Sequence, residues 1–215
     1  MSDGRILAVD TALGACSAAL LEGERVLSCR HVAMERGHAE ALAPMVDAVM
    51  REAALPFASL DRLAVTTGPG TFTGQRVGLS FMRGLRVALK KPLTGVTSLA
   101  AMAEQARCEM KANCAAAVHD ARRGEVYLEA VGAPVPVQIV AFEEALSLLK
   151  NVSGLIVAGT AAPRVAEALQ YVRLSPVIAP DAVWVARLAQ RLAADETVPR
   201  PLYLRAPDAK LPAQR

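Results

Sequence analysis

The chain has 215 residues, of which 53% are hydrophobic and 4% aromatic, and its mean hydropathy is +0.29. This apolar content excludes a disordered chain, and the length allows one large domain or two small ones. The scarcity of aromatic side chains argues against a nucleic-acid surface built on base stacking. The net charge of +3 is too small by itself to indicate a polyanionic partner.

Positive charge is nevertheless concentrated in two segments. No Asp or Glu occurs between Asp61 and Glu104, where all the charged residues are Lys or Arg. A second excess lies in the carboxyl-terminal tail, where Asp208 is the one acidic residue among these basic ones: Arg200, Arg205, Lys210 and Arg215. The sequence therefore predicts local basic patches on a chain that is close to neutral.

The cysteines and the amino terminus bear on the cellular compartment. Cys16, Cys29, Cys108 and Cys114 form no CxxC pair and no cluster with histidine at metal-ligand spacing, so we predict four free, buried cysteines. The first residues lack the long apolar run of a signal peptide, and uncharged stretches such as 151–163 are too short to span a bilayer. These features predict a reduced, soluble, cytoplasmic protein that does not associate with a membrane.

The first half of the chain is predicted to contain three antiparallel strands followed by alternating helices and strands. Short apolar runs with tight connections predict strands over 5–10, 15–22 and 25–33. Helical periodicity predicts a helix over 38–54, in which Pro44 indicates a kink or a later start. The elements predicted after it are strand 63–67, helix 75–89, strand 92–96 and helix 98–110.

The second half repeats this outline. The elements predicted there are strands 115–119, 125–131 and 135–140, helix 143–149, strand 155–158 and helix 182–194. Asp181 is placed to cap the last helix. The repetition predicts a mixed α/β fold with two related lobes, 1–111 and 112–215. The proline-rich tail is predicted to be extended, and mobile at its end.

Three glycine-bearing turns follow strands and could accept a phosphate group. The first contains Asp10 and Thr11, where backbone N–H groups could hold an anion and the carboxylate could position a hydrated metal ion. The second, 68–74, brings backbone amides and hydroxyls to a helix N-terminus, whose dipole favours an anion. The third contains Gly159 and Thr160. Each turn also has a plain structural interpretation, since Asp and Thr satisfy turn backbone groups and glycine relieves steric strain.

Side chains suited to catalysis are scarce. His31, His38 and His119 form neither HExxH nor HxxxH, so the sequence predicts no catalytic residue and no metal ligand. Asp120 and Glu125 are the candidates for a general base in a cleft between the lobes. A solvated hairpin tip explains these two residues equally well.

The helix over 38–54 is apolar over a wider arc than a helix lying on a sheet requires. The helix from Gln75 carries small residues that permit close backbone approach, and basic residues beside them. These features predict that the two helices bury each other in part and offer the remaining surface to a partner. The residues assigned to that interface are Leu42, Met45, Val46, Val49, Gly74, Arg76, Gly78 and Phe81.

Several motifs together resemble one known family. The segments RGHAEALAPM (36–45), TTGPGTFTGQRVGLSFMRGL (66–85) and DARRGEVY (120–127) are similar to those of TsaB, also called YeaZ. The resemblance covers nearly the whole chain. It implies two ribonuclease-H-like lobes of the actin/Hsp70/sugar-kinase (ASKHA) superfamily, with a nucleotide site that is degenerate or absent.

The resemblance also implies a function. TsaB is the partner of TsaD in making threonylcarbamoyladenosine beside the tRNA anticodon, and TsaD carries a helical HxxxH pair that holds iron or zinc. The equivalent stretch here, 97–101, contains no histidine. The resemblance therefore implies a non-catalytic scaffold that binds TsaD, and with it TsaE, through the two helices described above.

Further expectations concern ligands and assembly. The resemblance implies a homodimer when the chain is alone, indirect contact with tRNA, and no cofactor other than ATP or ADP at the interface of the complex. The residues themselves leave one alternative open, an active ATPase or phosphotransferase of the ASKHA type. That enzyme would use Asp10 and the three turns.

Overall fold

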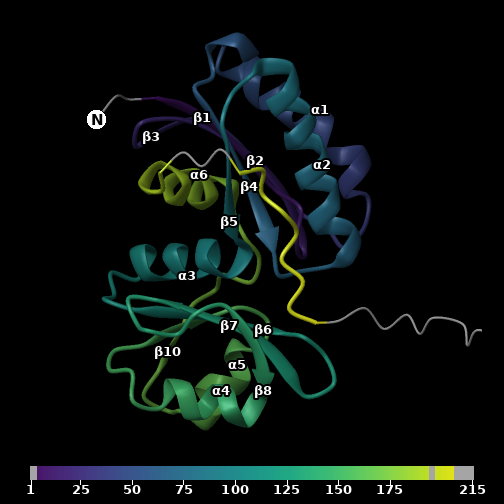
Figure 1. Ribbon diagram of the computed structural model, residues 1–215. Coiled ribbons are helices and arrows are strands. Elements are labelled where there is room, and N and C mark those ends of the chain that lie inside the picture. Colours follow the sequence, from purple (N-terminus) through teal and green to yellow (C-terminus); the bar gives the residue numbers. More distant parts are fainter. Residues whose placement is uncertain (1–3, 194–196, 206–215) are drawn as a thin grey trace, which may run out of the picture.

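Two five-stranded sheets with the same strand order form the framework of the molecule (Figure 1). The computed structural model describes residues 4–193 and 197–205. The first sheet has the order β3-β2-β1-β4-β5 and the second the order β8-β7-β6-β9-β10. In both, three antiparallel strands are joined by two parallel ones. The predicted α/β fold with an internal repeat is confirmed.

The first sheet is covered by helices on both faces, so its central strands are apolar on both sides. Its strands are β1 (Arg5–Asp10), β2 (Ala15–Glu22), β3 (Arg25–Ala33), β4 (Arg62–Gly68) and β5 (Leu93–Thr97). Helices α1 (His38–Glu52) and α2 (Phe72–Leu89) cover one face, where they pack against each other. Helices α3 (Ser98–Glu109) and α6 (Ala182–Arg191) lie on the other face. A short 3-10 helix, Phe57–Ser59, precedes β4.

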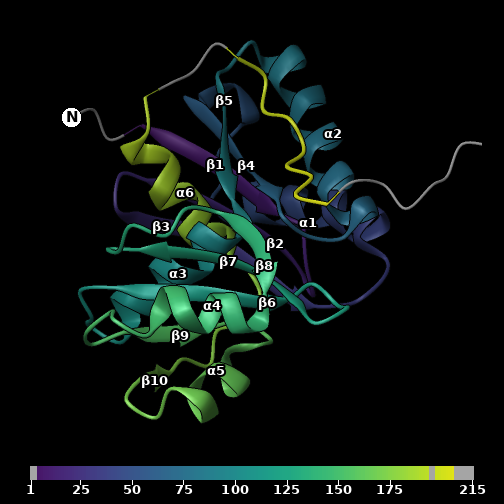
Figure 2. The same ribbon diagram turned by 60° about the horizontal axis from the view of Figure 1, so that its bottom comes forward.

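The second sheet lies on the far side of α3. Its strands are β6 (Ala115–Asp120), β7 (Glu125–Val131), β8 (Gln138–Ala141), β9 (Ile156–Ala158) and β10 (Arg173–Leu174). Helices α4 (Phe142–Leu149) and α5 (Ala162–Ala168) cover its outer face, which Figure 2 brings forward. The molecule is therefore a stack of five layers, with α3 and α6 in the middle layer.

Small apolar side chains fill the space between the sheets. Ala12 and Leu13 at the end of the first hairpin pack with Met102 of α3 and Ala117 of β6. The strands divide between the sheets on either side of the predicted lobe boundary at residue 111. Helix α6 nevertheless packs on β1 and β2 of the first sheet, although it comes from the second predicted lobe. The lobes themselves remain a prediction.

The first residue of a helix was predicted correctly for α1 and too late for α2. Helix α1 begins at His38, so Pro44 does not delay its start. Helix α2 begins at Phe72 and not at Gln75, because the Thr71 hydroxyl accepts a hydrogen bond from the Gly74 N–H at 3.0 Å and caps the helix there. None of the helices in the described part of the chain is long and apolar enough to cross a membrane.

The cysteine prediction was correct in one respect and wrong in another. All four cysteines are free. Cys16 and Cys114 are buried, but Cys108 is only half-buried and Cys29 is exposed, because it lies near the middle of the edge strand β3.

Residues 197–205, which we call the strap, run back along the first sheet beside α2 (Figures 1 and 2). The Leu202 N–H donates to the Thr67 carbonyl oxygen at 2.8 Å. The Nε atom of Arg83 on α2 donates to the Pro199 carbonyl oxygen at 3.1 Å. The strap is thus held by β4 and by α2. The predicted mobile end of the tail lies outside the described residues.

The strap also reaches the second sheet. Arg205 donates to the Ala121 carbonyl oxygen at 2.8 Å and forms an ion pair with Glu125, so it joins the strap to the β6–β7 turn. Gly95 of β5 leaves room for the strap, since a Cβ atom there would lie 2.9 Å from the Pro199 Cβ atom. The strap consequently contacts both halves of the fold.

Candidate functional site

The β1–β2 turn, the first of the three candidate phosphate turns, is closed by the beginning of α2. The Thr11 hydroxyl donates to the Gly74 carbonyl oxygen at 2.6 Å and accepts from the Gly78 N–H at 2.9 Å. The Thr71 N–H donates to the Ala12 carbonyl oxygen at 2.8 Å. The Thr11 hydroxyl, the side-chain donor that a phosphate could use in this turn, is therefore bonded to α2, and the turn packs against the loop before that helix.

Glycines permit this close approach. A Cβ atom on Gly70 would lie 2.2 Å from the Ala12 carbonyl oxygen, and one on Gly74 would lie 2.2 Å from the Thr11 carbonyl oxygen. A Cβ atom on Gly78 would lie 2.7 Å from the Thr11 hydroxyl. Gly74 and Gly78, predicted to lie at a partner interface, are both buried against the β1–β2 turn of their own chain, and their assignment to that interface stays a prediction.

Asp10 lies at the bottom of the same turn. Its Oδ1 atom accepts hydrogen bonds from the Thr66 hydroxyl at 2.5 Å and from the Ala12 N–H at 3.1 Å. Its Oδ2 atom has no partner among the described residues. Removal from water raises the pKa of Asp10 to about 7. Asp10 and Thr11, predicted to bind nucleotide, are 0% and 1% exposed, so both lie inside the packed turn.

The third candidate turn occupies the corresponding place in the second sheet. Gly159 has a φ of +100° and lies so close to β6 that a Cβ atom would meet the Val118 carbonyl oxygen at 2.4 Å. The hydroxyl of Thr160 accepts a hydrogen bond from the Asp120 N–H at 3.0 Å. Thr160 is exposed, in contrast to Thr11. These contacts explain Gly159 and Thr160 as a tight turn, and their assignment to nucleotide stays a prediction.

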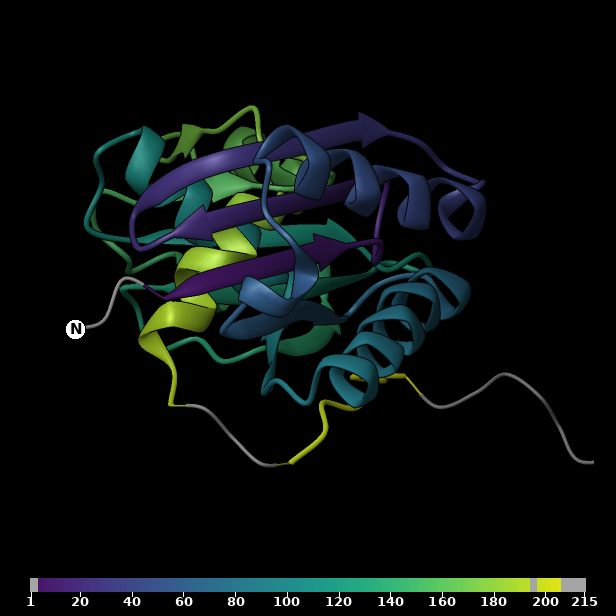
Figure 3. The same ribbon diagram turned by 90° about the horizontal axis from the view of Figure 1, so that it is seen from above.

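Helices α1 and α2 lie side by side on the outside of the first sheet (Figure 3). Leu42, Val46 and Val49, which were also predicted to lie at a partner interface, are completely or almost completely buried beneath α1 in the single chain, and that assignment stays a prediction. The wide apolar arc of α1 is used internally, because the helix packs on β2, β3 and α2 together. Met45 and Phe81 are half-buried at the edge of this core and remain within reach of a partner.

The last predicted interface residue, Arg76, belongs to an exposed cluster that the sequence does not reveal. The Arg76 guanidinium carbon lies 3.4 Å from the centre of the Phe72 ring, and its Nε atom donates to the Tyr203 hydroxyl at 2.8 Å. The two rings are stacked with their centres 5.8 Å apart. Phe72 and Tyr203 are 57% and 45% exposed. The residues are too far apart in the sequence for a motif to connect them.

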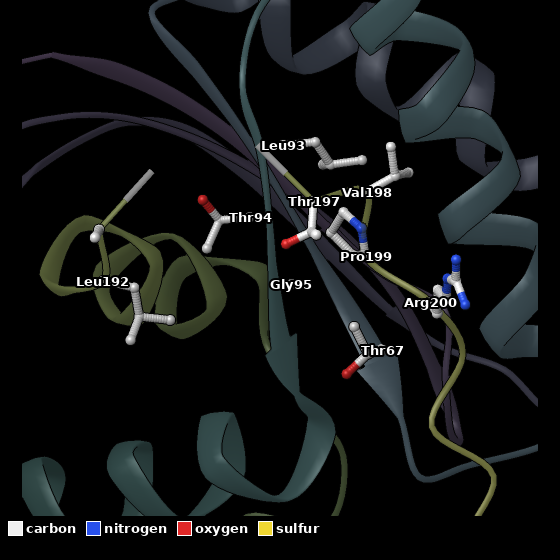
Figure 4. Close-up of a pocket in the computed structure, with 10 residues that line it drawn as sticks. Thr67, Leu93, Thr94, Gly95, Leu192, Thr197, Val198, Pro199 and Arg200 are labelled. Carbon is white, nitrogen blue, oxygen red and sulfur yellow. The ribbon is translucent and has the colours of Figure 1, made fainter. Parts of the chain in front are cut away.

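A cavity of about 630 Å³ lies between the edge of β5, the end of α6 and the strap (Figure 4). Hydroxyl groups of Thr67, Thr94 and Thr197 and the side chain of Arg200 line it. The Thr94 hydroxyl is buried and has no partner among the described residues. No combination of three or more His, Cys, Asp or Glu side chains within the described ranges could hold a metal ion.

Comparison with known proteins adds to this geometry. Residues 32–167 match the family model described as TsaD, tRNA N6-adenosine threonylcarbamoyltransferase. The tRNA threonylcarbamoyladenosine biosynthesis protein TsaB of Escherichia coli strain K12 is 37% identical over 123 residues, which are 57% of this chain and 53% of that protein. The match thus spans about half the length of this curated relative.

Two solved structures extend the comparison to the whole fold. A Pseudomonas aeruginosa structure, described as an uncharacterized protein with similarity to the peptidase YeaZ, is 30% identical with a TM-score of 0.78, covering 95% of this chain and 100% of that one. The ROK hexokinase of Thermus thermophilus, at 15% identity and a TM-score of 0.50, covers 87% and 99% of the two chains and shares the fold alone. These likenesses confirm the expected ASKHA fold.

Proposed function

Because the chain belongs to the TsaB (YeaZ) family, we propose that it is a non-catalytic subunit in the synthesis of threonylcarbamoyladenosine in tRNA. In this role it binds a TsaD-like threonylcarbamoyltransferase and, with it, a TsaE-like ATPase. A second copy of the chain takes the place of the transferase when the chain is alone. The names of the relatives and the match to the TsaD model support the pathway.

The main structural support for a non-catalytic role is that α2 closes the β1–β2 turn. An ATPase or phosphotransferase using Asp10 would need the hydroxyl and amides of this turn to face a phosphate. Here the Thr11 hydroxyl both donates and accepts within α2, and Gly70 packs on the Ala12 carbonyl oxygen. This packing favours the scaffold over the enzyme as the explanation of the turn.

The outer surface of α1 and α2 is the proposed docking site for the transferase. On α1 the exposed residues include Ala43 and Pro44, which lie next to the half-buried Met45. Phe81 is half-buried on α2. Small apolar side chains allow partner helices to approach closely, and burying them excludes water from the contact.

Substitution of glutamate for Ala43 tests this docking. Because Ala43 is exposed, the Ala43→Glu variant should fold normally, whereas a carboxylate enclosed by an apolar contact would lack a counter-charge. We expect co-purification with a co-expressed TsaD-like subunit to fall at least about tenfold, and tRNA modification to fall with it. Met45→Glu should act in the same direction.

Leu148→Glu is the matched control, because it adds the same charge at a 39% exposed apolar position of α4 on the outer side of the second sheet. It should leave co-purification unchanged. The docking proposal fails if the Ala43 and Met45 variants are folded by circular dichroism and still co-purify at the wild-type yield.

A further inference from the structure

The two basic segments of the sequence meet in the folded chain, and the proposed function does not account for them. Segment 62–103 contains no acidic residue and includes α2. The strap, 197–205, contains Arg200 and Arg205 and runs beside that helix. The hydrogen bond from Arg83 to the Pro199 carbonyl oxygen joins the two segments directly.

A groove of about 530 Å³ lies between α2 and the strap. The side chains that line it include three arginines, and no acidic side chain occurs among the lining residues of the described chain. The lining residues are Arg83, Arg86, Val87, Thr197, Val198 and Arg200. Three guanidinium groups around one groove are complementary to a ligand that carries several negative charges.

Aromatic rings are exposed on the same pair of segments. Phe72 at the start of α2 and Tyr203 in the strap are stacked, and the Arg76 guanidinium lies against the Phe72 ring. This contact fixes the ring while leaving more than half of the Phe72 side chain in solvent. Exposed, fixed rings beside arginines are the platform on which unpaired bases stack.

We propose that α2 and the strap bind a single-stranded segment of nucleic acid. Phosphates contact Arg83 and Arg200 in the groove, and an unpaired base stacks on the ring pair of Phe72 and Tyr203. An acidic protein surface would satisfy the arginines but would leave the flat rings unexplained. The choice of RNA over DNA rests on the proposed function, whereas the chemistry of the surface is shared by both.

This inference changes the expectation that tRNA is contacted only indirectly. The low aromatic content of the sequence argued against a stacking surface, but two rings suffice when folding brings them together at the surface. Because most of the contacts are ionic, we expect affinity measured at about 50 mM salt to fall steeply toward physiological salt.

The test measures fluorescence anisotropy of a labelled, unpaired RNA of roughly 15 nucleotides bound by the purified full-length chain. Phe72→Ala should raise Kd by about 5- to 100-fold through the loss of stacking. Arg200→Ala should raise Kd and reduce the slope of log K against log salt by about 0.7, the value for one phosphate contact on a single strand. Both side chains are exposed, so the variants should keep the wild-type melting temperature.

Arg51→Ala is the control, since it removes an exposed arginine of α1 and leaves the groove intact. It should keep Kd within about twofold of the wild type. The proposal is overturned if the wild-type chain does not bind at low salt, if the Phe72 and Arg200 variants bind like wild type, or if Arg51→Ala weakens binding equally. It is also overturned if a polyglutamate peptide competes as well as RNA does.

Equal binding of a labelled DNA of the same sequence would support the proposed binding surface, because RNA and DNA can make the same phosphate and stacking contacts. The assay contains no other subunit. Its failure therefore leaves the docking of a transferase on α1 and α2 untouched, and failure of the docking test leaves this surface untouched.

Discussion

Asp10 lies at the end of β1, where burial raises its pKa to about 7 against 3.8 for an ordinary aspartate. Between these two pH values the folded chain binds more protons than the unfolded chain. The free energy of unfolding should therefore fall as the pH rises from about 4 to 7, by up to about 4 kcal/mol from this group.

Asp10→Asn should remove that dependence, because the amide oxygen can still accept from Thr66 and Ala12 without carrying a charge. We expect the variant to be more stable than the wild type at pH 8 and similar to it at pH 4, as measured by urea denaturation. A variant that is less stable at pH 8 would show that the carboxylate is stabilised in its charged form.

Two glycines of α2 differ in their surroundings: Gly78 packs against the β1–β2 turn, whereas the space beside Gly84 is open. Gly78→Ala places a methyl group 2.7 Å from the Thr11 hydroxyl, so we expect a loss of about 1–3 kcal/mol in the free energy of unfolding. Gly84 has nothing within 4 Å, and Gly84→Ala should gain about 0.5–1 kcal/mol from helix propensity. Thermal and urea denaturation measure whether each variant is more or less stable than the wild type. Equal changes in the two variants would contradict the close packing of Gly78 against the turn.

Most of the helices and strands follow from local sequence. The first three strands have the predicted bounds, and the helix beginning at Ser98 is capped by the Thr97 hydroxyl, which accepts from the Ala100 N–H at 3.1 Å. Asp181 likewise caps α6 by accepting from the Val183 N–H at 2.8 Å. Periodicity and capping act within a few residues, so they can be recognised from one sequence.

The faces of the helices are less predictable. The apolar width of α1 was interpreted as a partner surface, but Leu42, Val46 and Val49 face the sheet and the neighbouring α2. The small residues Gly74 and Gly78 were interpreted as helix contacts, but they face the β1–β2 turn. The residue composition of a helix face indicates that the face is buried. It does not indicate which element covers the face, because that element can be distant in the sequence.

At the scale of the whole molecule, the middle layer is joined by a buried carboxylate. Glu104 of α3 is 1% exposed and lies 2.8 Å from Arg107 and 2.5 Å from Arg191 of α6. The hydrogen bonds from Arg107 and Arg191 lower the pKa of Glu104 to about 2, although burial of the carboxylate by itself would raise it. The ionised Glu104 carboxylate contributes up to about 3 kcal/mol to the free energy of unfolding. This contribution is complete above pH 4.5 and is lost as the pH falls through 2.

Glu104→Gln should therefore reduce the free energy of unfolding by about 2–4 kcal/mol at pH 7, because both arginines lose their counter-charge. The difference from wild type should shrink as the pH falls from 4.5 toward 2. Glu109→Gln, at the exposed end of the same helix, should change stability by less than about 0.5 kcal/mol. A constant difference at all pH values would contradict the role given to the charge.

The strap was not predicted beyond its extended backbone, because its contacts with the two sheets and α2 join residues at least 80 positions apart. Gly95→Val should displace it, since even a Cβ atom would lie 2.9 Å from Pro199. We expect faster trypsin cleavage after Arg205 in this variant, followed by mass spectrometry, because the bond after Arg200 precedes Pro201 and resists trypsin. Thr94→Val, a substitution of similar volume at the neighbouring position, should leave the cleavage rate unchanged. Equal rates for the Gly95 variant and the wild type would show that the strap tolerates the added side chain.

The position of the strap also determines where the chain can be tagged. The described chain begins at Gly4, directly before the central strand β1, and ends at Arg205, which contacts the β6–β7 turn two residues after Tyr203 contacts Arg76 of α2. A handle fused directly after Arg205 is tethered close to both proposed binding surfaces, while one fused directly before Gly4 is tethered at the end of β1 opposite to the turn that meets α2. We therefore expect a pull-down through a handle after Arg205 to lose the partner by obstruction, whereas a pull-down through a handle before Gly4 measures association.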